Sequence, residues 1–200
     1  MTDKHHWKAK PYSAEYDEMR AQIVTAAWDL IGEKGVAALR LDEVAIRANC
    51  ARSSIYRYFS NKKELLIAVL IKWLFESQAS LWPILEKIDD PLDRLVEGIY
   101  LPMLEIRKTP YFRDTKNDNN FLLASLALEA VPEIMSTFFD PYFEQMQKMG
   151  WLRENVSSEE AARWILIILI SMGVFGSGGL SQREERAYLK KMLIPSLLKI

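Results

Sequence analysis

Apolar side chains recur at helical spacing along almost the whole chain, and this periodicity constrains the fold more than any other feature. Ile23, Ala27 and Leu30 would share one face of a first helix, which Gly35 can close in a left-handed conformation. Strand signals are nearly absent, since no hairpin dipeptide stands between alternating β-branched runs. Half of the 200 residues are hydrophobic, so a core is readily built. The sequence therefore predicts an all-α fold.

Prolines and polar caps divide the remaining chain into further helices. We expect Lys62 to open a long helix that Pro83 ends or kinks, and Ser157 or Ser158 to begin another. The other expected elements are a helix over residues 92–108, a polar loop over 113–120, an apolar region over 121–149 interrupted by Pro132 and Pro141, and a last helix from about Arg183.

Positive charge is concentrated in one short segment. The formal net charge is −1, yet residues 40–63 hold six basic side chains against two acidic ones. A protein that binds nucleic acid over its whole surface is usually more basic. One segment is therefore basic, and the rest of the chain is mildly acidic.

The same segment contains a helix-turn-helix pattern over residues 39–65, which read LRLDEVAIRANCARSSIYRYFSNKKEL. Ala45 and Ala48 are small enough for two helices to pack closely, and Asn49 tolerates a positive backbone angle in the turn. Ile55 and Phe59, four residues apart, would anchor the second helix to the core.

The second helix of this pattern would turn Arg52, Ser53, Tyr56 and Arg57 outward. Arginine can bind guanine in a bidentate fashion, and hydroxyls reach base edges or phosphates. Lys62 begins the next helix, where free N–H groups and the helix dipole favour a phosphate. These residue types suit a helix that enters the major groove of DNA.

The segment from about Arg20 to Leu70 resembles the DNA-binding domain of the tetracycline-repressor (TetR) family. A small residue and a turn precede the pattern Ile-Tyr-x-Tyr-Phe-x-x-Lys-x-x-Leu, which matches Ile55, Tyr56, Tyr58, Phe59, Lys62 and Leu65. The resemblance implies contacts to bases by Arg52, Ser53 and Tyr56, and to phosphates by Ser54, Tyr58, Lys62 and Arg40. The family's usual Gly-Val-Ser turn is here Asn-Cys-Ala, and Ala51 gives up a helix cap at a cost of about 1 kcal/mol.

The resemblance also implies a domain organisation and a mechanism. We expect a flexible tail over residues 1–17, a three-helix DNA-binding domain over 18–64, and a helical bundle for ligand binding and dimerisation over 65–200. A two-fold homodimer would place its recognition helices in successive major grooves of a palindromic operator in double-stranded DNA. A small-molecule effector in the bundle would release the DNA by population shift. Family habit favours a repressor, and no cofactor is implied.

The helix from about Glu159 to Phe175 is apolar all round, so it must be covered on every side. Its own bundle would cover one side, and a second copy would cover the other in a four-helix interface. The expected interface residues are Trp164, Ile168, Leu169, Met172, Tyr188 and Met192. The twelve apolar residues from Trp164 span only about 18 Å, short of a bilayer core of roughly 30 Å, so we expect a buried helix and a cytoplasmic protein.

Large side chains are dense over residues 73–151, and apolar pockets use such walls together with a few polar groups. Each of them is more often plain core. The candidate ligand-binding residues are Trp73, Met103, Phe121, Leu122, Ser125 and Glu129. If the face with Ser125 and Glu129 points inward, the pocket suits a hydrophobic or aromatic molecule, and Glu129 would favour a cationic one.

Two other function classes stay open, an all-α enzyme and a structural DNA-binding protein without a sensor. An enzyme would need a base, but His5 and His6, the only histidines, lie in the expected tail. The run GSGG over residues 176–179 follows a helix and lacks the lysine of a phosphate-binding loop, and no acidic cluster has metal-ligand spacing. No catalytic or metal-binding residue is therefore predicted. Cys50, the single cysteine, is interpreted as a packed residue rather than as a redox sensor.

Overall fold

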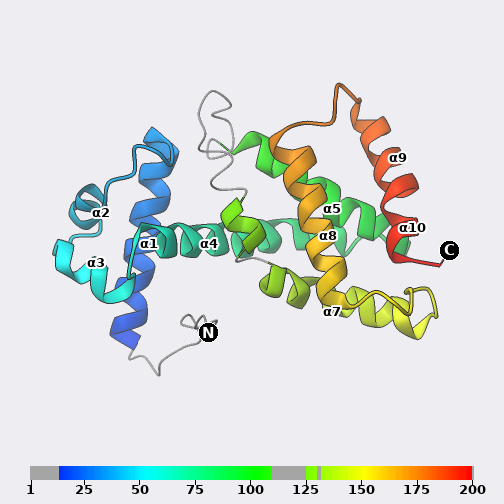
Figure 1. The fold of residues 1–200 in the computed structure, drawn as a ribbon, viewed down its shortest axis with the longest axis horizontal. Helices are drawn as coiled ribbons and strands as arrows, with labels where there is room; N and C mark the ends of the chain where they lie inside the picture. Colours follow the sequence, from blue (N-terminus) through cyan, green and yellow to red (C-terminus); the bar gives the residue numbers. More distant parts are fainter. Residues whose placement is uncertain (1–13, 110–124, 130–131, 200) are drawn as a thin grey trace. The chain divides into compact units, whose positions relative to one another are not determined.

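The computed structural model describes residues 14–109, 125–129 and 132–199 (Figure 1). Within these residues there is no β-strand, and one isolated bridge joins Leu152 and Leu198. The helices, in chain order, are α1 (Ala14–Lys34), α2 (Leu41–Arg47), α3 (Arg52–Tyr58), α4 (Lys62–Leu85), α5 (Pro91–Lys108), a short helix over residues 125–129, α7 (Pro132–Lys148), α8 (Ser158–Val174), α9 (Gln182–Met192) and α10 (Ile194–Leu197). The all-α prediction is confirmed.

The chain divides into two compact units, one ending at Val69 and the other beginning at Leu70. The division falls inside α4, so this helix contributes to both units. The boundary expected after residue 64 lies in the same helix. α1 already begins at Ala14 and takes in the end of the expected tail, whose residues 1–13 lie outside the described residues.

In the first unit, α1, α2 and α3 enclose a small core. Ile23, Val44, Ile55 and Phe59 have almost no exposed surface. Each large apolar side chain buried in this way is worth about 1.5–3 kcal/mol relative to an exposed one. The guanidinium of Arg20 lies over the Phe59 ring, 5.1 Å from its centroid. The core therefore holds Ile23, Ile55 and Phe59, whose spacing in the sequence predicted a buried face.

Helix ends largely follow the capping signals in the sequence. Gly35, directly after α1, has a φ of 80°, as predicted for a left-handed closing residue. Ser157 caps α8 by accepting a hydrogen bond from the Glu160 N–H, and the Glu160 carboxylate accepts one from the Ser157 N–H. Asp90 caps α5, which ends before Thr109 as predicted.

Prolines interrupt the helices less than expected. Pro132 begins α7, but α7 continues through Pro141 to Lys148, so the expected interruption at Pro141 is wrong. Pro83 lies in the last turn of α4, which ends shortly afterwards at Leu85. A proline inside a helix removes one backbone hydrogen bond, and the packing of α7 on α8 can offset that loss.

In the second unit, α8 packs on α5 and α7, and α9 packs on α5. Tyr100, Met103 and Ile165 are fully buried among these helices. A Cβ atom at Gly173 would lie 2.9 Å from Cγ2 of Ile106, which is closer than Cβ atoms approach in proteins. Glycine at this position therefore permits the close approach of α8 to α5.

A buried carboxylate connects α9 to α5. Glu185 is only 1% exposed and accepts hydrogen bonds from two nitrogens of Arg107, at 3.1 and 2.6 Å, and from the Ser177 hydroxyl. Burial acts to raise the pKa of Glu185, but the hydrogen bonds from Arg107 and Ser177 outweigh it and hold the pKa below its ordinary value. Arg107 also donates to the Met172 carbonyl, at 2.9 Å, and so ties α5 to α8.

Among the described helices, α4 is the one that is long and apolar enough to cross a membrane, judged by length and composition alone. The absence of membrane contact stays a prediction.

Candidate DNA interface and effector pocket

The helix-turn-helix geometry is built as the residue pattern predicts. Ala45 and Ala48 are buried where α2 meets α3, and Asn49 in the turn has a φ of 50°. The backbone N–H of Cys50 donates to the Ala45 carbonyl, at 3.0 Å, and closes the turn. α3 begins after Ala51 with no side-chain cap, which confirms the expected loss of capping.

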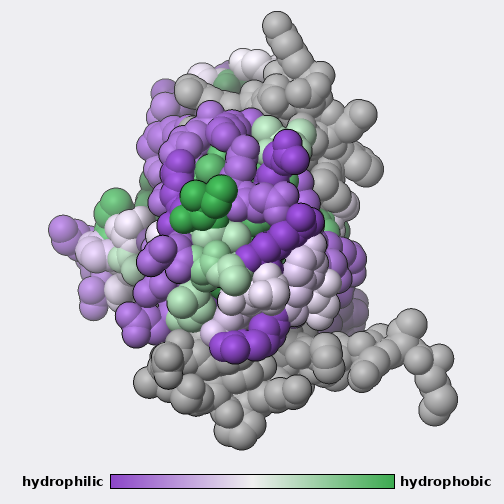
Figure 2. All heavy atoms as spheres, turned by 90° about the vertical axis from the view of Figure 1, so that its left-hand side faces the viewer, coloured by the Kyte–Doolittle hydropathy of each residue, from purple (hydrophilic) through white to green (hydrophobic). Residues whose placement is uncertain are grey.

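α3 is anchored on one side and exposed on the other. Ile55 and Phe59 are buried, whereas Arg52, Ser53, Tyr56 and Arg57 are exposed as predicted; Ser54 is half-buried. Figure 2 views the molecule from the side of α2 and α3, where hydrophilic side chains surround a small hydrophobic patch. The predicted base-contacting residues thus lie together on the open face of a firmly held helix.

Arg52 is paired with α2 in this structure. Its Nη1 lies 2.9 Å from Oδ1 of Asp42, and both side chains are largely exposed. A hydrogen bond with Tyr56, together with the charge of Asp42, raises the pKa of Arg52. This ion pair was not predicted from the sequence, although a carboxylate and a guanidinium on adjacent helices of the motif could have suggested it. A base contact through this nitrogen would require Arg52 to leave Asp42.

Two residues that were predicted to contact phosphates, Lys62 and Tyr58, also make hydrogen bonds within the first unit. Lys62 Nζ donates to the carbonyls of Val36 and Leu39, at 3.2 and 2.8 Å, and burial lowers the pKa of Lys62. Tyr58 is only 8% exposed, and its hydroxyl accepts a hydrogen bond from Arg57 at 3.0 Å. Lys62 therefore stabilises the connection between α1 and α2, a role that sequence reasoning missed. The phosphate contacts of both residues stay predictions.

The start of α4 is less open to anions than expected. The Glu64 N–H donates to Oδ1 of Asn61, and the Glu64 carboxylate accepts from the Ser60 N–H. A carboxylate therefore already occupies the positive end of the helix dipole. Arg40, which directly precedes α2, is exposed and stays a candidate for a phosphate contact.

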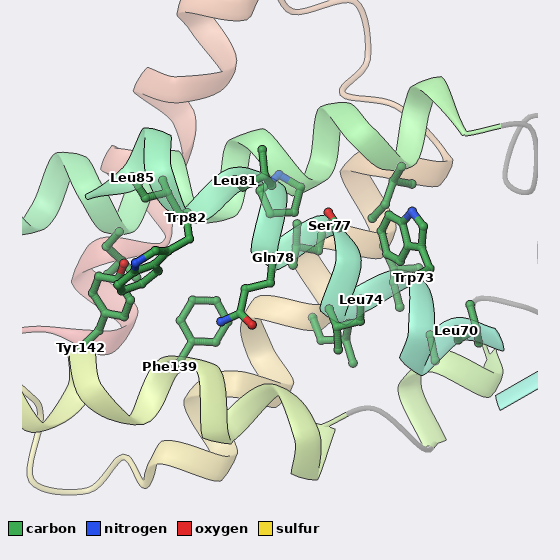
Figure 3. Close-up of a pocket in the computed structure, with 18 of the residues that line it drawn as sticks. Leu70, Trp73, Leu74, Ser77, Gln78, Leu81, Trp82, Leu85, Phe139 and Tyr142 are labelled. Atoms are coloured by element: carbon green, nitrogen blue, oxygen red, sulfur yellow. The ribbon is translucent and has the colours of Figure 1, made fainter. Parts of the chain in front are cut away.

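The second unit contains a largely apolar cavity of about 100 Å³ (Figure 3). Its wall comes from α4, α5, α7, α8 and the helix over residues 125–129. Of the predicted ligand residues that the structure describes, Trp73 alone lines the cavity, and it lies on α4 with Leu74, Leu81 and Trp82. The second half of α4 thus forms one long side of the cavity.

The other described residues predicted to bind a ligand do not line this cavity. Ser125 and Glu129 are exposed and do not line the cavity; Ala127 of the same short helix does. Met103 is fully buried but lies outside the lining. The helix register decides this, since it turns Leu126 and Ala127 inward. Phe121 and Leu122 lie outside the described residues, as does most of the expected 113–120 loop.

Apart from the two tryptophans, the described residues with polar side chains that line the cavity are Ser77, Gln78, Arg94 and Tyr142. Arg94 Nε donates to the Ile88 carbonyl at 2.7 Å. The Tyr142 hydroxyl is buried without a hydrogen-bond partner among the described residues, and its ring lies edge-on to Trp82 with centroids 6.3 Å apart. Burial raises the pKa of Tyr142, while the positive charge of Arg94 acts in the opposite direction. Sequence reasoning missed Arg94, although its spacing from Gly98 and Pro102 puts the three on one face of α5.

α8 and α9 expose apolar side chains on the surface of the second unit. Trp164, Tyr188 and Met192 are exposed and Ile168 is half-buried, in keeping with an interface. Leu169 and Met172, also expected there, are buried within the chain, because Leu169 faces the cavity and Met172 packs inside the unit. The exposed side of α8 instead continues through Ile167 and on to Phe175, just after the helix ends; neither was predicted.

Comparison with known proteins identifies the first unit. Residues 23–69, which include α2, the turn and α3, match the family model described as bacterial regulatory proteins, tetR family. These residues are a DNA-binding domain of the TetR family. Its helix-turn-helix is therefore a DNA-binding element, and this TetR-family protein is a transcriptional regulator.

The similarity extends beyond the motif. This TetR-family protein is 23% identical over 188 residues to the HTH-type transcriptional regulator MT1294 of Mycobacterium tuberculosis, covering 92% of this chain and 88% of that protein. It is 41% identical over 54 residues to the HTH-type transcriptional activator FasR of Mycolicibacterium smegmatis, covering 27% and 25% of the two chains. The solved structure of RolR in complex with resorcinol has a TM-score of 0.67 at 18% identity, covering 89% of this chain and 88% of RolR, and shows the same fold.

The described residues of this TetR-family regulator include no cluster of three or more histidine, cysteine or acidic side chains able to hold a metal ion. Burial raises the pKa of the half-buried Cys50 thiol, which favours its interpretation as a packed residue. His5 and His6 lie outside the described residues.

Proposed function

We propose that this regulator is a homodimeric, cytoplasmic repressor that binds a palindromic operator and releases it when a small hydrophobic or aromatic molecule enters the cavity. The observation that carries the proposal is that α4 belongs to both units of the chain. Leu65 and Leu66 at its start are buried in the DNA-binding unit, while residues from Leu70 to Leu85 line the cavity. A molecule that shifts this helix would act on both units at once.

The exposed face of α3 supports reading of base edges. Arg52 offers the bidentate donor geometry that suits guanine, and Ser53 and Tyr56 add hydroxyl groups next to it. Ser54, Arg57 and Arg40 would contact phosphates. Tyr58 and Lys62 would do so as well, although both already make hydrogen bonds within the unit. Two copies of α3, related by a two-fold axis, would read the two half-sites of a palindrome.

The lining of the cavity supports an apolar effector. Two tryptophans, Trp73 and Trp82, and several leucines form its wall, and polar groups are few. RolR, which shares the fold, has been solved with resorcinol, a small aromatic molecule. A cavity of about 100 Å³ is on the scale of engineered cavities, near 150 Å³, that take up benzene.

The exposed apolar side chains of α8 and α9 support a homodimer. Trp164, Ile167 and Met192 would cost free energy if left in water, and a second copy of the same face would cover them. FasR is named an activator, so likeness in the DNA-binding segment does not choose between activation and repression. We favour repression because a dimer that spans two major grooves blocks access to an overlapping promoter.

The test begins with an operator selected from random duplexes by the purified protein. Fluorescence anisotropy should show preference for this operator over a scrambled duplex, and affinity should fall steeply as salt rises. Small aromatic and hydrophobic compounds are then screened for release of the DNA. Failure to prefer any duplex would refute the proposed operator binding.

A variant that fills the cavity distinguishes a regulator that senses an effector from a structural DNA-binding protein without a sensor. A Cβ at Gly98 meets only Leu85, at 3.9 Å, so Gly98→Leu should fit and fill the cavity. We expect Gly98→Leu to bind the operator normally but to release it at a much higher effector concentration than wild type or Gly98→Ala. Equal release by all three proteins would place the effector site elsewhere, and no release by any compound would favour the structural alternative.

A further inference from the structure

We infer that the effector is an anion, a small aromatic or aliphatic carboxylate whose charged group is bound by Arg94 and Tyr142 at one end of the cavity. This inference rests on the proposed function of the cavity as the effector site. It also replaces the cationic preference expected from Glu129, because Glu129 lies on the outer side of its helix and not in the lining.

The described residues of the cavity wall carry positive charge and no negative charge. Among the described residues that form the wall, Arg94 is the only aspartate, glutamate, lysine or arginine. The acidic residues near it on α5 are engaged elsewhere: Asp90 caps the helix, Asp93 pairs with Lys190 at 2.7 Å, and Glu97 pairs with Arg186. A cation in the cavity would therefore meet a positive charge and no acidic side chain among the described residues of the wall, whereas an anion would be attracted to Arg94.

Arg94 uses only one of its nitrogen atoms in a hydrogen bond to a described residue. Its Nε is held by the Ile88 carbonyl, which fixes the orientation of the guanidinium plane. Its two terminal nitrogens make no hydrogen bond or ion pair with any described residue. A guanidinium held at one edge presents the other edge as a planar fork, and a carboxylate matches that fork with two parallel hydrogen bonds.

Tyr142 supplies a second donor at the same end. Its hydroxyl is buried and has no hydrogen-bond partner among the described residues, an arrangement that is rare because an unpaired buried donor is costly. Burial raises the pKa of Tyr142, so the hydroxyl keeps its proton and can donate it to an acceptor oxygen. Arg94 precedes Gly98 by one turn of α5, and a Cβ at Gly98 would lie 3.9 Å from Leu85, which lies at the same end of the lining as Tyr142 (Figure 3). A ligand carboxylate would satisfy both Arg94 and Tyr142.

The remainder of the cavity specifies an apolar body. In Figure 3, Tyr142, Trp82 and Leu85 lie at one end of α4's lining face, and Trp73 and Leu70 lie toward the other. Between these ends the wall is mostly leucine and aromatic. The volume of about 100 Å³ matches a molecule with one ring or a short branched chain.

Three probes of equal size and different charge test the inference: 4-isopropylbenzoate, 4-isopropylbenzyl alcohol and 4-isopropylbenzylamine. Binding is followed by quenching of tryptophan fluorescence, since Trp73 and Trp82 line the cavity. We expect the benzoate to bind wild type at least tenfold more tightly than the alcohol, with the amine weakest. Arg94→Gln should lose the benzoate preference and keep alcohol binding, Arg94→Lys should restore part of it, and Tyr142→Phe should weaken benzoate binding alone.

Arg163→Gln, which removes an exposed arginine of α8 from outside the cavity, is the matched control and should behave as wild type. Equal affinity of wild type for benzoate and alcohol, or a benzoate preference that survives in Arg94→Gln, would overturn the anionic class and leave the cavity as effector site intact. Failure of all three probes to bind would overturn the inference itself. The proposed function fails separately, if no compound of any charge releases the operator.

Discussion

Asp42 forms an ion pair with Arg52, the residue that we propose contacts a base of the operator. Substitutions of the two partners should therefore change the affinity for the operator in opposite directions. Arg52 Nη1 lies 2.9 Å from Asp42 Oδ1, with 60% and 44% of the two side chains exposed. Removing Arg52 should weaken binding, because a base contact is lost. Removing the charge of Asp42 should strengthen binding, because Arg52 is then released before it meets DNA.

The structure sets the size of both effects. An ion pair this exposed is screened by water, so Asp42→Asn should tighten operator binding by no more than about fivefold. Loss of a bidentate contact to guanine costs far more, and Arg52→Ala should raise the Kd roughly 5- to 150-fold and relax selection at one base pair per half-site. In the Arg52→Ala background, Asp42→Asn should gain less than in wild type, since its partner is gone.

The assay is fluorescence anisotropy on the selected operator and on single-base variants of each half-site. Glu43→Gln is the matched control, because Glu43 is the next acidic residue on α2 but pairs with Lys34, at 2.9 Å, on α1. An unchanged affinity and an unchanged selected sequence in Arg52→Ala would refute the base contact. Equal gains from Asp42→Asn in both backgrounds would show that the ion pair plays no part.

Three further variants probe the rest of the molecule. Ile167→Asp, on the exposed side of α8, should give monomers in sedimentation at micromolar concentration, whereas Leu169→Asp should unfold the second unit because Leu169 is buried; a dimeric Ile167→Asp protein would move the interface elsewhere. Gly173→Ala should lower the free energy of unfolding by about 1–3 kcal/mol, since its Cβ would press on Ile106, and an unchanged melting temperature would contradict that contact. Glu185→Gln should lower the free energy of unfolding at neutral pH by roughly 1–3 kcal/mol. Because the folded-state pKa of Glu185 is lowered, its contribution is present above the ordinary glutamate pKa and is lost as pH falls through the folded value, so the difference from wild type should close in acid; a gap independent of pH would count against the charged pair.

Most of the first unit follows from signals that act within a few residues. Asn49 tolerates the positive φ that the turn needs, and it has a φ of 50°. Ile55 and Phe59 lie four residues apart and are both buried, so the exposed side of α3 follows from spacing alone. The same holds for the start of α8 in the second unit, where Ser157 finds its capping partner three residues away. Such features depend on local geometry, which the sequence expresses directly.

The second unit was harder to predict, because its helices are apolar on more than one side. The sequence of α8 does not distinguish Leu169, which lines the cavity, from Ile167, which faces solvent. Glu129 and Arg94 are both charged residues on helices with apolar neighbours, yet only Arg94 reaches the lining. Helical spacing determines which residues share a face, but the face that turns inward depends on packing between helices far apart in the chain, as where α8 meets α5 at Gly173.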